Sequence, residues 1–460
     1  MMAPILWLLL YLAALFLIGH VTVSLIFKDE SRSLTECFAS VVSVGAGALS
    51  LILFWVSLAG FAPGRIALVF VVIIFGTAQF QHLRNHRWPW MTTRPSAPVS
   101  SWEWTCLIGC GAMIAGCVAI VSIHAVAQPV YELDAFAIWA LKAKVLAHES
   151  LWSRPEYFSD PAFSFSHQDY PLLVPFLVAG VYGAIGQTNE YLGKSVFLIL
   201  YLAFVFQVFT ALRWKLNRPT SLLLTVLAVS LPPVLRWAGA GTADLALTLY
   251  YAGAVFYFLR WLEKERRSDL VMSILYSVFM AFTKNEGFAA MLLVAGLMLL
   301  FSVLSRSKTK LASFGFFSAG ILLLYFPWLW WSRALPHTHE NYGARLRPDL
   351  LVQNLDRVGV IMGEFCRRAS NWSRWSGIWL LLPTVAIIDF RGWKNRSVVA
   401  LWLLLLAQIT LYVVIFVVAP WNVQELASAA LERLLVQMVP LVVFLIGLHW
   451  AAIGGSVPRS

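Results

Sequence analysis

Asp134 is the first of several ionisable side chains that stand at the edges of long apolar stretches. It occupies the segment VYELDAF at positions 130–136, directly before a stretch rich in Ala and Leu that predicts a helix over 134–148. A carboxylate at such a dry boundary can accept a proton from a substrate hydroxyl, because the low dielectric strengthens its field. Asp is also a preferred N-cap residue, so the local sequence leaves a general base and a plain helix cap as alternatives.

His167, Asp169 and Tyr170 form a second group, at the entry to a short apolar segment. They lie in the run HQDYPL at positions 167–172. Asp169 can position a substrate or help to hold a metal ion. Alternatively, Asp169 and Tyr170 are ordinary loop residues, and Pro171 holds the residue before it in an extended conformation.

Asp244, Lys284 and Glu286 lie where predicted helices begin. Asp244 follows the run GAGTA, and an acid in the first turn of a helix is favoured by the helix dipole. Lys284 and Glu286 interrupt an apolar stretch, and the two charges can simply neutralise each other. Lys284 can instead bind a lipid phosphate as a point charge. Because a turn between two helices needs no charge, we favour the phosphate-binding interpretation.

The run HTHE at positions 337–340 is the sequence feature that most suggests a metal ion. His337, His339 and Glu340 alternate as ligands do in some loops, but two histidines and one glutamate in a loop are a weak signal. The sequence therefore requires no cofactor, and a divalent metal stays an open alternative.

The elements that position these side chains belong to a membrane protein. Of the 460 residues, 60% are apolar and only 12% are charged, whereas soluble domains carry about 25% charged residues. The net charge of +11 comes from short Lys and Arg clusters between apolar runs, which is how topology is fixed in a bilayer. We therefore attribute most of the excess of Lys and Arg residues to membrane topology and a few of them to a phosphate ligand. We do not attribute it to nucleic-acid binding.

The apolar runs predict an all-α polytopic fold with about thirteen membrane-spanning helices. A span needs about 20 apolar residues, and several of the runs are short. The predicted spans cover residues 4–27, 37–58, 66–80, 104–126, 195–212, 221–235, 243–262, 270–282, 287–304, 311–331, 378–390, 398–418 and 434–453.

Every second loop is basic, which makes those loops cytoplasmic by the positive-inside rule. The alternate segments then face outward, and they carry all of the ionisable groups described above. The apolar segment 171–186 is too short to span and would reverse the later loops, so we expect it to lie in the outer leaflet or to re-enter. The helix at 134–148 is expected to lie along the interface. The outward segments are 128–170, 237–242, 284–286, 332–376 and 419–430.

The order of these features resembles the GT-C superfamily of membrane glycosyltransferases, which includes protein O-mannosyltransferases and the lipid A aminoarabinose transferase. Their catalytic module begins with a span that enters a long outer loop carrying an essential acid, similar to Asp134. A Tyr-Pro-Pro-like motif then enters a short apolar segment, similar to Tyr170. The first loop departs from the family in having Glu132-Leu133-Asp134 where an Asp-Glu pair is usual, and the second proline after Tyr170 is absent.

Further motifs of the family follow in the same order. A Thr-Asp or Ala-Asp helix start is matched at Asp244, and a Thr-Lys-x-Glu/Gly-like turn is matched at Lys284. Downstream, Arg433 and Pro440 fit an Arg-Tyr-x-x-Pro-x-x-Pro helix start, although its Tyr and first Pro are replaced. The resemblance is best over residues 104–304, and it divides the chain into an N-terminal three-helix extension (1–103), a catalytic membrane module (104–310) and C-terminal helices (311–460) with the outer loop 332–376.

The resemblance implies an inverting transfer of a hexose or pentose from a polyprenyl-phosphate donor to a lipid, glycan or protein acceptor. Asp134 would be the general base. Lys284, with Arg433 or Arg345, would hold the departing phosphate. The expected location is the bacterial plasma membrane, with the site on the non-cytoplasmic face. The other substrate-binding residues would be His167, Asp169, Tyr170, Asp244 and Glu286.

A flippase or other transporter of lipid-linked glycans is the alternative from another class, because it would use the same outward charges as a substrate path. Transporters usually show internal repeats and broken helices near the bilayer midplane. The sequence shows no convincing repeat, and its charges gather at one face, so we favour the transferase.

Overall fold

The computed structural model describes residues 2–28, 30–85, 100–336, 342–390 and 392–453. His337, His339 and Glu340 lie outside the described residues. All regular secondary structure in the described part is helical, which confirms the all-α prediction. In chain order the helices are α1 (Met2–Ile26), α2 (Leu34–Leu58), α3 (Arg65–Asn85), α4 (Ser101–Ser122), η1 (Ile123–Ala127), η2 (Ala135–Ala140), α5 (Leu141–His148), η3 (Leu151–Ser153), η4 (Glu156–Phe158), η5 (Pro161–Ser166), α6 (Leu173–Ile185), α7 (Glu190–Gly193), α8 (Ser195–Arg213), α9 (Arg218–Val229), α10 (Pro232–Gly239), α11 (Asp244–Lys264), α12 (Arg267–Thr283), α13 (Asn285–Leu304), α14 (Lys308–Ser332), α15 (Tyr342–Arg345), α16 (Pro348–Gln353), α17 (Arg357–Ala369), α18 (Trp372–Trp375), α19 (Ile378–Ile388), η6 (Gly392–Lys394), α20 (Arg396–Val418) and α21 (Val423–Ile453).

The polytopic membrane fold is also confirmed, but it contains fewer full-length spans than the sequence suggested. Among the described residues, nine helices are long and apolar enough to cross a membrane. The count becomes ten if α9 and α10, which are bent by 65° at a short break, form one span. The expectation of about thirteen also counted α3, α12 and α19. The apolar part of α3 (Arg65–Gln81) and the whole of α12 and α19 are shorter than the roughly 20 residues that a bilayer requires.

The short apolar segment that follows Tyr170 forms α6, which ends at Gly186 in a left-handed conformation (φ 77°). Its 13 residues extend about 20 Å at 1.5 Å per residue. That is less than the roughly 30 Å of a hydrocarbon core. The length agrees with the prediction that this segment does not span, and the position of its ends in the bilayer stays a prediction.

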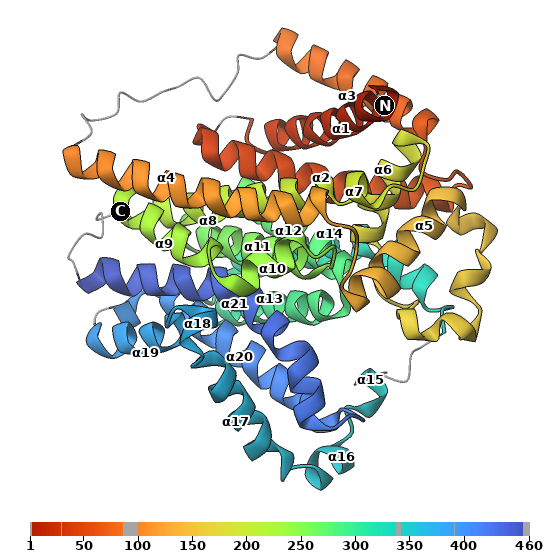
Figure 1. Ribbon diagram of the computed structural model, residues 1–460. Coiled ribbons are helices and arrows are strands. Elements are labelled where there is room, and N and C mark those ends of the chain that lie inside the picture. Colours follow the sequence, from red (N-terminus) through yellow and green to blue (C-terminus); the bar gives the residue numbers. More distant parts are fainter. Residues whose placement is uncertain (1, 29, 86–99, 337–341, 391, 454–460) are drawn as a thin grey trace.

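Helix α11 forms the centre of the fold. Figure 1 shows α11 and α12 in the middle of the molecule, with α1, α2 and α3 on one side and α17, α19 and α20 on the other. All residues of α11 from Asp244 to Leu262 are buried, which is expected of a helix that is apolar on all sides. It packs against α12, α8 and α21. Because α11 is held on every side, the residue at its N-terminal end, Asp244, has a fixed position.

The first two helices pack closely on each other and on this centre. A Cβ atom at Gly19 would lie 1.8 Å from the carbonyl oxygen of Val41, and one at Gly45 would lie 2.1 Å from that of Leu15. Only glycine therefore allows α1 and α2 to approach so closely. Helix α2 in turn packs against α6 and α8. The division at residue 103 stays a prediction, although the N-terminal helices share the core with the helices after it.

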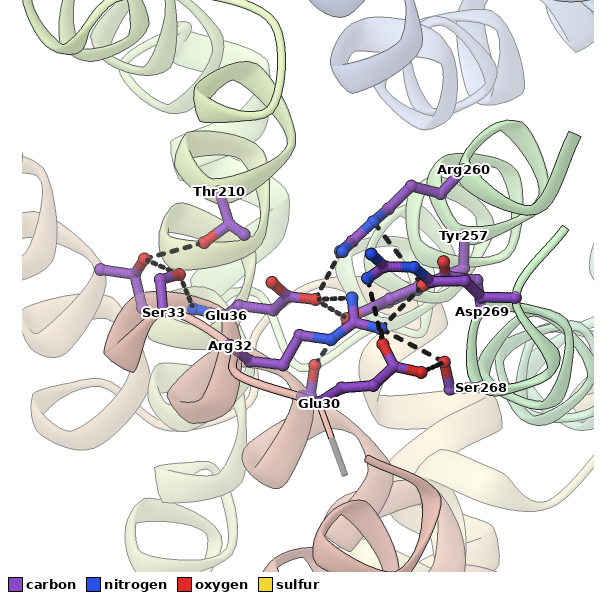
Figure 2. Close-up of polar contacts among 12 residues, drawn as sticks. Glu30, Arg32, Ser33, Glu36, Thr210, Tyr257, Arg260, Ser268 and Asp269 are labelled. Carbon is purple, nitrogen blue, oxygen red and sulfur yellow. Dashed lines mark hydrogen bonds and ion pairs between the residues drawn. The ribbon is translucent and has the colours of Figure 1, made fainter. Parts of the chain in front are cut away.

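A buried ionic network joins the loop between α1 and α2 to the C-terminal end of α11 and the N-terminal end of α12 (Figure 2). Arg32, whose side chain is 1% exposed, donates to Glu36 at 2.8 Å and to Asp269 at 3.2 Å, and it also pairs with Glu30. Arg260 donates to Glu36 at 2.6 Å. Two guanidinium groups thus face three carboxylates, one from the loop (Glu30), one from α2 (Glu36) and one from α12 (Asp269). Since buried charges are stable only when paired, the network fixes the loop on these two helices.

Candidate functional site

Asp134 does not cap a helix. It precedes the π-helical turn η2, but its side chain makes no capping hydrogen bond. It accepts a hydrogen bond from Nη1 of Arg433, which lies 299 residues away in the sequence, on α21. The Asp134 side chain is 37% exposed and that of Arg433 is 15% exposed. The structure thus disagrees with the plain-cap interpretation and places Asp134 in an ion pair that remains accessible.

Asp244, Lys284 and Glu286 form a second set of ion pairs. Asp244 is the first residue of α11 and is buried, and Lys284 occupies the extended link between α12 and α13. The Lys284 Nζ lies 3.3 Å from Asp244 Oδ1 and 2.9 Å from Glu286 Oε1. Gly287 makes this link possible, because a Cβ there would lie 2.0 Å from the carbonyl oxygen of Met280.

Arg433 connects the two sets. Besides Asp134, its guanidinium interacts electrostatically with Asp244 and Glu286. One oxygen of Glu286 and the Nε of Arg433 are buried and form no hydrogen bond to any described residue. Two cations and three carboxylates from four distant segments therefore make one site, and some of its donor and acceptor atoms are not yet used. Such a site can hold an anion next to a carboxylate that accepts a proton.

The residues predicted in the run at 167–170 gather around Lys142. The Lys142 side chain is fully buried, its Nζ donates to the carbonyl oxygen of His167, and it lies 5.4 Å from the centre of the Tyr170 ring. The His167 and Tyr170 rings stack at 4.5 Å. Burial lowers the pKa of the Lys142 ammonium to about 7, against the opposing effect of Asp169. The Oδ1 atom of Asp169 is buried and has no hydrogen-bond partner in the described part of the chain.

Arg345 is the last residue of α15, and its Nε donates to the carbonyl oxygen of Val418 at 2.7 Å. It thus contacts the end of α20, and Arg433 is the arginine that the structure pairs with Asp134. In the described ranges, no three His, Cys, Asp or Glu side chains are arranged to hold a metal ion.

Three residues next to the site were not selected from the sequence: Trp237, Arg374 and Glu432. Trp237 lies within an apolar run, where an aromatic residue is normally taken as packing. The signal that was available for Glu432 is its position next to Arg433, because two charges in succession are unusual within an apolar helix.

Comparisons with known proteins support the relationship that the motifs suggested. Residues 169–331, which include Asp244, Lys284 and Glu286, match the family described as dolichyl-phosphate-mannose-protein mannosyltransferase. The fold is similar to the crystal structure of ArnT from Cupriavidus metallidurans bound to undecaprenyl phosphate, with a TM-score of 0.52 and 12% sequence identity. That comparison covers 78% of this chain and 62% of the ArnT chain, so the chain spans less than two thirds of that relative.

No curated protein matches the chain in sequence. At 12% identity, the likeness to ArnT shows the fold alone. The family match covers the segment that supplies Asp244 and Lys284, and the fold extends the likeness over most of the chain. In both its family segment and its fold, this integral membrane protein resembles the GT-C superfamily of membrane glycosyltransferases.

Proposed function

We propose that this chain is an inverting glycosyltransferase that moves a sugar from a polyprenyl-phosphate donor to a hydroxyl group of an acceptor. The observation that carries the proposal is the convergence of Asp134, Arg433 and Lys284 in one site. Polyprenyl phosphate is a good leaving group once its charge is matched, and fixed cations supply that match. A carboxylate beside those cations supplies the base.

The reaction is a single displacement at the anomeric carbon of the donor sugar. The acceptor oxygen forms a bond to that carbon on one face, and the bond to the phosphate oxygen breaks on the opposite face, which inverts the configuration. Asp134 takes the proton of the acceptor hydroxyl. Arg433 and Lys284 bind the departing polyprenyl phosphate, and Asp244 and Glu286 hold Lys284 in place.

The ion pair between Asp134 and Arg433 suggests an order of binding. While Asp134 Oδ2 accepts the hydrogen bond from Arg433, that oxygen is not available to accept the proton of a hydroxyl group. The donor phosphate would give Arg433 a second anion and thereby release Asp134. The donor then binds before the acceptor hydroxyl is activated.

The remaining predicted residues are assigned to the acceptor side. Asp169, with His167 and Tyr170, would orient an acceptor hydroxyl in the first outer loop. Lys142 contacts the carbonyl oxygen of His167 and the ring of Tyr170 and would hold them in place. Arg345 would contribute from the second outer loop. The sugar and the acceptor remain proposals at the level of class: a hexose or pentose, and a lipid, glycan or protein.

Replacement of Lys284 tests the phosphate site. Lys284→Ala is expected to raise the KM for a polyprenyl-phosphate sugar by roughly ten- to a hundredfold, the size of one lost charge-assisted hydrogen bond. The KM is measured with purified protein from initial rates of glycoside formation.

Lys144→Ala is the matched control, because Lys144 is a half-exposed lysine of the first outer loop that pairs with Glu190 at 2.9 Å. It should leave the donor KM within about threefold of the parent, as expected for an exposed ion pair. A parental donor KM in the Lys284 variant would remove Lys284 from the phosphate site.

We further propose that the site faces the non-cytoplasmic side of a bacterial plasma membrane, and thiol labelling tests this. In a background without the five native cysteines, Glu149→Cys and Gln353→Cys place exposed thiols in the two outer loops. Both are expected to react with an impermeant thiol reagent in intact cells. Lys308→Cys, in a predicted cytoplasmic loop, should react only after the cells are opened. Labelling of the Lys308 variant alone in intact cells would reverse the orientation.

A further inference from the structure

Trp237 contacts the site through Arg433. It lies on α10, the short helix that follows the 65° bend after α9, and its side chain is buried. The Arg433 guanidinium carbon lies 5.5 Å from the centre of the Trp237 ring, within the range of a cation–π contact. On the same ring, the Arg236 guanidinium carbon lies at 4.7 Å. The indole thus lies against the cation that pairs with Asp134.

The indole is also fixed in orientation. Its Nε1 donates to Glu432 Oε1 at 3.2 Å, and Arg374 Nε donates to the other oxygen of Glu432 at 3.0 Å. Glu432 and Arg433 are consecutive on α21, so their side chains leave the helix about 100° apart. Trp237 therefore contacts both of these side chains: its N–H donates to Glu432, and its ring contacts the guanidinium of Arg433.

The same ring also contacts the arginine that binds the loop carrying the base. Arg236 Nη2 lies 2.9 Å from Glu132 Oε1, and Glu132 is two residues before Asp134. The ring of Trp237 thus contacts the guanidinium that holds the Asp134 loop and the guanidinium that pairs with Asp134 itself.

We propose that Trp237 is a positioning residue that holds Arg433 while its guanidinium changes partner from Asp134 to the donor phosphate. This inference rests on the proposed function. A cation–π contact holds the charge but leaves the N–H donors of the guanidinium available, whereas a carboxylate in the same place would occupy them. Arg433 can therefore exchange one oxyanion for another without leaving its place.

Binding of undecaprenyl phosphate to the purified protein in detergent tests the proposal. Trp237→Leu removes both the ring and the N–H, and it is expected to weaken binding about tenfold. Trp237→Phe loses the N–H and one of the two fused rings but keeps an aromatic face, so its affinity should stay within about threefold of the parent. In the transfer assay, Trp237→Leu should raise the donor KM while changing kcat by less than about threefold.

Trp152→Leu is the control, because Trp152 is an exposed tryptophan of the first outer loop. Trp237→Met, whose longer and flexible side chain also lacks a ring, replaces Trp237→Leu if that variant does not fold. Equal binding by the parent and the ring-free variant would overturn the role of Trp237 alone, and so would equal losses in the Leu and Phe variants. A parent that does not bind undecaprenyl phosphate would overturn the proposed function and this inference with it.

Discussion

Asp134→Asn is expected to reduce glycosyl transfer by about a hundredfold or more. The amide has nearly the same shape as the carboxylate, but it cannot accept the proton of the acceptor hydroxyl, and the loss of a general base usually costs 10²- to 10⁴-fold. The rate is measured as glycoside formed at saturating donor. At that concentration, weaker binding of the lipid cannot explain a slow reaction.

The folded protein should tolerate this change. Asp134 makes no capping bond and is 37% exposed, so its ion pair with Arg433 contributes at most about 1 kcal/mol to stability. Glu156→Gln, at an exposed carboxylate of the same outer loop, is the matched control and should transfer sugar at the parental rate. If Asp134→Asn also reached that rate, Asp134 would be only a partner of Arg433, and the assignment of the base would be wrong.

Arg32→Ala is expected to destabilise the folded protein by about 3–5 kcal/mol, the usual cost of leaving buried charges without a partner. Arg32 is 1% exposed, and the Asp269 carboxylate that it contacts is fully buried. Without Arg32, the network shown in Figure 2 would hold one buried guanidinium, that of Arg260, against three carboxylates. The free energy of unfolding in detergent micelles, or the shift of the unfolding midpoint, measures the effect.

Arg266→Ala is the control for this network. Arg266 pairs with Glu30 at 3.2 Å, but its side chain is 45% exposed, so its loss should cost less than about 1 kcal/mol. A loss below 1 kcal/mol for Arg32→Ala as well would mean that water reaches and solvates the network. In that case the network would not be what fixes the N-terminal helices on α11 and α12.

The sequence predicted the parts of the fold and of the site that depend on residues close together in the chain. Apolar runs predicted the helices, and the basic loops predicted which side of the membrane each loop faces. The motif at Thr283-Lys284-Asn285-Glu286-Gly287 predicted the turn, because a charged break between two apolar stretches has few other structural solutions. Asp134 was selected for its position at the start of a helix, and the structure confirms an element there, although as a π-turn followed by α5.

Other features depend on contacts between distant residues, which no local pattern contains. The partner of Asp134 lies 299 residues away, and only the packing of α21 brings it near. The spacing of Lys142 and Lys144 predicts that they point to different sides of a helix, but it does not predict which one is buried. Around Arg32, charges from three separate segments look like ordinary loop residues until α11 and α12 bring them together.

One detail of a predicted span had a signal in the sequence. The run 221–235 is predicted as one span, and the structure bends it by 65° between α9 and α10, which leaves one broken span or two separate helices. Pro232 and Pro233 lie at that break. Proline disfavours a helical residue before it and cannot donate to the helix, so two in succession predict an end and a new start. The break matters because it turns α10 and its Trp237 toward the site.

The fate of the bond between sugar and phosphate tests the central claim most directly. Purified protein in lipid vesicles would be supplied with a polyprenyl-phosphate sugar labelled in the sugar, together with candidate acceptors. The proposed transferase predicts a labelled glycoside of inverted configuration, free polyprenyl phosphate in equal amount, and about a hundredfold less of both with Asp134→Asn. A broken helix pair is a feature of transporters as well. Movement of the intact lipid-linked sugar across the bilayer, without any labelled glycoside and at the same rate in both proteins, would contradict the account.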